Sequence, residues 1–279
     1  MTVALVTDST ATLPGGLVEL AGATVVPLHV VVGAETHLDG TVPSAMVADA
    51  LRHGVPVSTS RPSPERFADV YAEAAEAGAD EVVSVHLSSG VSGTYDAALL
   101  AAREAPVPVH VVDSTQVGMA VAFSVLAAAR ARDAGVSAEE VAAAAEQAGR
   151  ASTSLLYVDT LEHLRRGGRI GAASALLGTA LAVKPLLTIA EGEVRPLEKV
   201  RTASRAIARL EALAVEAARA CAGGCDVGVQ HLAAGEQALA VVERLRRELG
   251  RDDLLVTEVS PVLGAHVGPG LLGISITPY

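Results

Sequence analysis

The sequence predicts an α/β protein with two domains. The first would contain a mostly parallel, Rossmann-like sheet with helices on both faces, and the second a mixed α/β sheet. Three observations support this fold class. Half of the 279 residues (50%) are apolar, which is enough for two cores. Apolar runs alternate with segments of helical periodicity in the first part of the chain. This pattern changes after about residue 152.

The first domain is expected over residues 1–151. Its strands are predicted at runs rich in Val and Leu, namely 3–7, 25–32, 82–87 and 109–112. Its helices are predicted where Ala, Glu and Arg dominate, namely 44–53, 64–77, 92–104, 116–133 and 137–149. A serine at each of four helix starts can accept a free backbone N–H, and these are Ser44, Ser63, Ser92 and Ser137.

The second domain is expected over residues 152–279. It opens with a strand at 153–158, a short helix, the turn GGRIGA and an apolar stretch that runs through Leu187. The remaining elements are predicted at 202–220 (helix), 225–230 (strand), 235–249 (helix), 254–259 (strand) and 271–276 (strand). No linker-like tract separates the domains, so we expect them to be compactly joined.

Charge and cysteine content exclude several classes of function. The net charge is -11, and Lys184 and Lys199 are the two lysines, so no nucleic-acid partner is expected. Cys221 and Cys225 fit neither a zinc site nor a redox pair, and we expect reduced thiols and no metal. The first ten residues, MTVALVTDST, contain no basic leader and no spanning helix. A cytoplasmic protein without stable membrane insertion is therefore expected.

The apolar residues are almost all aliphatic. The chain has 2 Phe, 4 Tyr and no Trp, so Ala, Val and Leu must fill its cores. Smooth aliphatic walls suit alkyl chains, although compositional bias would give the same enrichment.

The loop SSGVSGT follows the predicted strand DEVVSVHL and opens a helix. Backbone N–H groups at such a helix start bind anions. A nucleotide-binding phosphate loop would need a nearby lysine, which is missing here. A carboxylate needs only a few donors. The alternative is purely structural, with Ser92 capping the helix and Gly90 and Gly93 forming the turn.

Two further polar loops offer hydrogen-bond donors. In VSTSRPSP, Thr59 and Ser60 precede Arg61 and a helix entry, which a capped loop would also explain. In GAHVGPG, His266 lies between glycines in a predicted loop before the last strand. An imidazole there can donate to a carboxylate, or can be an ordinary surface residue.

Asp8 and Asp113 each follow a predicted strand, at the edge of a parallel sheet where ligands bind. A stand-alone phosphatase or acyl hydrolase using Asp8, Asp113 and His266 is therefore an alternative function. Each aspartate can equally cap its own turn, and no HExxH, CxxC or GxSxG pattern supports catalysis.

Six segments together resemble the DegV family of fatty-acid-binding proteins: VTDSTATLP (6–14), TSRPSP (59–64), SSGVSGTYDAA (88–98), VVDST (111–115), LRRGGRIG (164–171) and GAHVGPG (264–270). They occur in the family's order and span nearly the whole chain. The resemblance implies two α/β domains that hold an acyl chain between and within them. The FakB members of the family present this fatty acid to a separate kinase, which phosphorylates its carboxylate.

The resemblance also implies a site with no catalytic residue, no metal and no cofactor beyond a bound fatty acid such as palmitate or oleate. The carboxylate would be held by Thr59, Ser60, Ser89, Gly90 and His266. The fatty-acid kinase would dock on Arg165, Arg166 and Arg169. The family commonly has Gln where Arg61 stands, so the head-group contacts could differ here. A carrier of another apolar lipid stays open, and the sequence does not indicate acyl chain length or oligomeric state.

Overall fold

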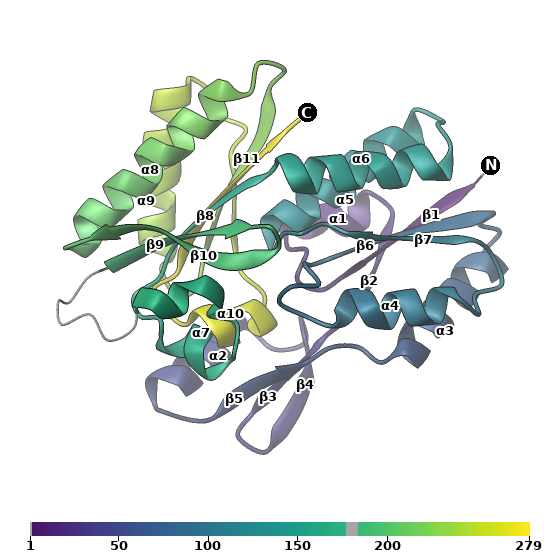
Figure 1. The fold of residues 1–279 in the computed structure, drawn as a ribbon, viewed down its shortest axis with the longest axis horizontal. Helices are drawn as coiled ribbons and strands as arrows, with labels where there is room; N and C mark the ends of the chain where they lie inside the picture. The colour runs from purple at the N-terminus through teal and green to yellow at the C-terminus, as the bar shows by residue number, and fades with distance from the viewer. Residues whose placement is uncertain (1, 177–183) are drawn as a thin grey trace.

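The computed structural model describes residues 2–176 and 184–279, which form three sheets (Figure 1). The first is a parallel sheet in the order β2-β1-β6-β7. Its strands are β1 (Val3–Asp8), β2 (Ala23–Val26), β6 (Glu81–His86) and β7 (Val109–Asp113). One face carries α3 (Pro64–Glu76) and α4 (Thr94–Ala102), and the other carries α1 (Leu17–Leu20), α5 (Met119–Asp133) and α6 (Ala138–Ala151). The short helix η1 (Pro14–Gly16) directly precedes α1. The predicted parallel sheet with helices on both faces is confirmed.

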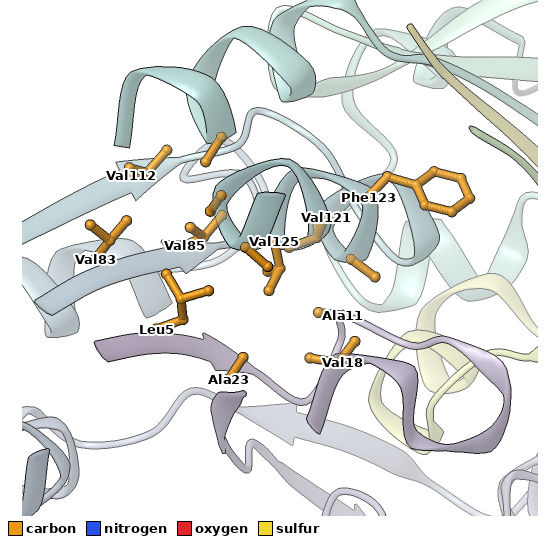
Figure 2. Close-up of a cluster of buried hydrophobic side chains, with 14 of the residues drawn as sticks. Leu5, Ala11, Val18, Ala23, Val83, Val85, Val112, Val121, Phe123 and Val125 are labelled. Carbon is orange, nitrogen blue, oxygen red and sulfur yellow. The ribbon is translucent and has the colours of Figure 1, made fainter. Parts of the chain in front are cut away.

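Alternating strand residues fill the two cores of this sheet. Leu5 packs with α5 and α6, whereas its neighbour Val6 packs with Phe67 of α3 on the opposite face. Figure 2 shows Val121 and Val125 of α5 close to Leu5. Because successive strand side chains point to opposite faces, a strand covered on both sides becomes a continuous apolar run.

Helix α5 also joins the first sheet to the second. Phe123 points away from the strand residues Leu5 and Val83 in Figure 2. Gly228 belongs to the second sheet, and a Cβ added to it would lie 3.2 Å from the Phe123 ring. This side of α5 therefore packs against the second sheet at a glycine. The helix is therefore buried on several sides, as its largely apolar sequence requires.

The second sheet is mixed and has the order β10-β9-β8-β13-β11-β12. Its strands are β8 (Thr153–Tyr157), β9 (Lys184–Ala190), β10 (Glu193–Val200), β11 (Cys225–His231), β12 (Leu255–Glu258) and β13 (Leu272–Pro278). Its helices are α7 (Glu162–Arg166), η2 (Gly171–Leu176), α8 (Ala203–Ala220), α9 (Gly235–Leu249) and α10 (Pro261–Val267). The charged strand β10 was not predicted, and residues 177–183 of the predicted apolar stretch lie outside the described residues. The expected boundary near residue 151 falls between α6 and β8.

A third, antiparallel sheet in the order β4-β3-β5 was also not predicted. It contains β3 (His29–Val32), β4 (Glu35–Leu38) and β5 (Val57–Ser60), and α2 (Ser44–Arg52) lies beside it. The single strand predicted over 25–32 is wrong, because Pro27 separates β2 from β3. Proline cannot donate to a strand ladder, so the chain leaves the parallel sheet there.

Several predicted details of helix starts need correction. Ser63 and Ser137 cap α3 and α6 as expected. Ser44 is instead the first residue of α2, and its hydroxyl donates to the Val259 carbonyl at 2.6 Å. Helix α4 begins two residues after Ser92, and the Ser92 hydroxyl accepts the Thr94 backbone N–H at 3.3 Å as expected. Within the described ranges, no helix combines the length and apolarity needed to cross a membrane.

Candidate functional site

A cavity of about 370 Å³ lies beyond the carboxyl ends of β2, β6 and β7. It is bounded on the other side by the mixed sheet and by α10. Most of its wall is aliphatic: Leu28, Leu87, Val91, Val117, Leu156, Val158, Leu164, Ile189, Val194, Val262, Leu263 and Val267. Its position agrees with the rule that ligands of α/β proteins bind outside the carboxyl edge of the strands.

Thr59 and His266 form the centre of the polar part of this cavity. Thr59 comes from β5, and His266 lies in α10 rather than in the loop that the sequence predicted. The Thr59 Oγ1 and His266 Nε2 atoms are 2.8 Å apart. Burial, and then the positive charge of Arg169, lower the pKa of His266 to about 4, so the imidazole is neutral at neutral pH. Its Nδ1 atom is buried and has no hydrogen-bond partner among the described residues.

Ser60, Arg61 and Arg169 line the same cavity. The Arg169 guanidinium donates to the Val91 carbonyl at 2.9 Å and to the Gly167 carbonyl at 2.6 Å. These hydrogen bonds connect the turn after α7 to the loop after β6, so Arg169 joins two segments of the cavity wall.

Ser89 and Gly90 lie close to this site, but the cavity wall as described does not include them. The Ser89 hydroxyl donates to the Asp113 carboxylate at 2.5 Å. A Cβ at Gly90 would lie 2.7 Å from the Gly192 carbonyl oxygen, so this glycine permits close contact with the turn between β9 and β10. Their predicted contact with a carboxylate stays a prediction.

The predicted docking arginines differ in their environments. Arg165 and Arg166 both bind the Glu162 carboxylate, at 2.7 Å in each case, and both are exposed on α7. Arg166 and Arg169 border a second cavity of about 420 Å³, which shares Thr59 and His266 with the first. Arg166 and Arg169 therefore lie beside the polar part of the site.

Asp8 belongs to a buried polar network. Its carboxylate lies 3.1 Å from His86 Nδ1, and His86 Nε2 lies 2.7 Å from Ser84 Oγ. The order of groups resembles a hydrolase triad, but all three side chains are fully buried. Asp8 and Asp113 are both absent from the cavity wall as described. No cluster of three or more His, Cys, Asp or Glu side chains in the described ranges could hold a metal.

Asp39, which no sequence motif marks, supports the site. Its buried carboxylate accepts the Ser9 hydroxyl at 2.7 Å and the Val262 backbone N–H at 3.1 Å. It thus connects the loop after β1 to the start of α10, the helix that carries His266. Burial raises the pKa of Asp39 to about 6 despite these hydrogen bonds.

This raised pKa predicts a pH-dependent stability. The folded protein holds the Asp39 proton more tightly than the unfolded chain does, so this proton stabilises the folded state. Its contribution to the unfolding free energy is complete below about pH 4 and is lost as pH rises through 6. Two pKa units correspond to about 3 kcal/mol. We therefore compare the unfolding free energy of the wild type with that of Asp39→Asn. The difference, wild type minus variant, should fall by up to about 3 kcal/mol between pH 4 and pH 7. Urea denaturation across this range measures it, and a constant difference would contradict it.

Comparisons with known proteins agree with this architecture. The sequence profile of the family described as uncharacterised protein, DegV family, matches residues 2–279. A DegV domain-containing protein of Streptomyces coelicolor is 54% identical over 277 residues, which cover 99% of this chain and 98% of that relative.

Solved structures of the same family superpose over the full length. A DegV family protein from Thermus thermophilus, described as fatty acid binding, is 36% identical with a TM-score of 0.91. DegV from Bacillus subtilis, described as a fatty acid binding protein, is 31% identical, also with a TM-score of 0.91. Both comparisons cover 100% of each chain. On the profile match, the relatives and the shared fold, this chain belongs to the DegV family.

Proposed function

We propose that this protein binds one long-chain fatty acid, such as palmitate or oleate, and presents it to a fatty-acid kinase that forms the acyl phosphate. The observation that carries the proposal is a cavity whose wall is mostly aliphatic and which has a polar cluster, Thr59, Ser60 and His266, in one part of that wall. Its volume lies within the range of small-molecule sites, about 300 to 1,000 Å³. The fatty-acid binding of the Thermus and Bacillus relatives adds support.

The acyl chain supplies most of the affinity in this proposal. Each buried methylene contributes about 0.8 kcal/mol, so about fourteen give on the order of 11 kcal/mol before ordering costs. The carboxylate would be costly to bury without donors. The Ser60 hydroxyl and the Thr59–His266 pair can supply them. One hydrogen of that pair is used in its own hydrogen bond, so the pair offers one donor to the ligand. The polar cluster therefore fixes the orientation of the ligand.

Two alternatives are less well supported. An enzyme that uses Asp8, Asp113 and His266 would need them around one cavity, but Asp8 is fully buried in its own network. A carrier of another apolar lipid fits the same aliphatic wall. Native mass spectrometry of protein purified without detergent, followed by extraction, distinguishes these functions. A stoichiometric fatty acid supports the proposal, and a different lipid or failure to take up added oleate overturns it.

Kinase docking is proposed on the exposed arginines beside the polar cluster. Arg165 and Arg166 share the Glu162 carboxylate, so together these three residues keep one net positive charge. The kinase step is tested with purified kinase, ATP and loaded carrier. Acyl phosphate that forms only when both proteins are present supports a presentation role.

Replacing Thr59 by valine should weaken binding of palmitate about tenfold or more. Valine keeps the branched shape but removes a hydroxyl, and a hydrogen bond to a charged group contributes about 1.5 to 3 kcal/mol. Thr36→Val is a matched control, because Thr36 lies exposed on β4 of the same sheet and outside the cavity wall. Equal affinities for both variants, measured by titration with palmitate, would argue against a head-group role for Thr59.

A further inference from the structure

Arg61 lies in the cavity wall directly after β5. Its side chain crosses Gly93, where an added Cβ would lie 2.3 Å from Arg61 Nη1 and 3.2 Å from its Cδ. The backbone of Gly93 has φ -79° and ψ 17°, angles that other residues also adopt. Gly93 is therefore needed for the close approach of the arginine rather than for an unusual backbone conformation.

The guanidinium of Arg61 has unused donors. Within the described ranges it makes no hydrogen bond and no ion pair, whereas Arg169, the other arginine of the cavity wall, donates to two backbone carbonyls. The wall as described contains no Asp or Glu, and His266 is neutral at neutral pH. Of the two arginines in the cavity wall, Arg61 is thus the one whose N–H groups remain available to a ligand.

We infer that Arg61 binds the ionised carboxylate of the ligand and selects fatty acids over neutral lipids with the same tail. A guanidinium presents two parallel N–H donors that match the two oxygens of a carboxylate. A fatty alcohol fills the same apolar wall but gains little from this charge. This inference rests on the proposed fatty-acid function and adds the residue that sets its selectivity.

The test compares Arg61→Gln with the wild type for two ligands of equal length, tetradecanoate and 1-tetradecanol. Arg61 is exposed, and ion pairs near solvent contribute about 1 kcal/mol, so the variant should bind tetradecanoate about three- to tenfold more weakly and tetradecanol with unchanged affinity. Arg103→Gln is the matched control, because it removes the same charge from an exposed position outside the cavity wall. Its affinity for both ligands should equal that of the wild type.

A second variant tests the contact with Gly93. As a single substitution, Gly93→Ala should displace the Arg61 side chain and weaken tetradecanoate binding. In a protein that already carries Arg61→Gln, the same substitution should cause little further loss of affinity. Arg61→Gln with an unchanged preference for tetradecanoate over tetradecanol would overturn the role of Arg61 alone. A wild type that binds neither ligand would instead overturn the proposed function.

Discussion

Replacing Asp8 by alanine should destabilise the fold by about 3 to 5 kcal/mol, because each buried donor left without its acceptor costs about 1 to 3 kcal/mol. Its carboxylate accepts the backbone N–H groups of Thr10 and Leu87, each at 3.0 Å, besides its contact with His86. Burial raises the pKa of Asp8, but the hydrogen bonds and charge of its partners outweigh burial and lower the pKa overall. Without the carboxylate, several buried donors lose their acceptor. Urea denaturation measures the loss.

Asp113→Ala provides a matched control within the same chain. Asp113 is followed by Ser and Thr as Asp8 is, and it also ends a strand of the parallel sheet. Its partners Ser89 and Thr115 lie nearer to solvent, so water can replace the lost carboxylate. We expect a loss of about 1 kcal/mol for Asp113→Ala. Equal losses for the two variants would show that burial of the Asp8 network does not matter.

The parallel sheet could be predicted because its strands and helices are local patterns. Val-rich runs buried on both faces, such as β6, alternate with helices that begin at capping residues such as Ser63 and Ser137. The antiparallel sheet gave no such signal. Strand β5 alternates half-buried and exposed residues, and β4 is mostly exposed, but each covers only four positions, too few to separate from a loop.

The polar part of the site was only partly predictable. Thr59 and His266 stand out in their loops, but their contact joins residues 207 positions apart. The role of Asp39 depends on a hydrogen bond to Val262 across 223 positions, which local sequence does not reveal. Such supporting residues become visible only when the chain is folded.

The residues that form the aliphatic wall could not be predicted. Leu155 belongs to the core beneath α8, while its neighbour Leu156 lines the cavity. Both residues are leucine, but they project from opposite faces of β8. Sequence indicates that both are buried, but it does not indicate which of them borders a space.

Filling this space should abolish most of the affinity for long acyl chains. Ile189 lies on β9 in the cavity wall and is only 4% exposed, so Ile189→Trp would place an indole in the volume that the ligand needs. Exclusion of about five methylenes costs about 4 kcal/mol, which is roughly a thousandfold in Kd. Titration with fatty acids of increasing length measures the effect, and the loss should be greater for long acids than for short ones.

Overpacking by tryptophan also costs stability, typically about 1 to 3 kcal/mol, so folding of Ile189→Trp must be checked by circular dichroism and urea denaturation. Leu239→Trp is the matched control for the added indole, because Leu239 is exposed on α9 and lies outside the cavity wall. This control should bind palmitate as the wild type does. A folded Ile189→Trp protein that still binds palmitate with wild-type affinity would mean that the acyl chain occupies a different part of the molecule.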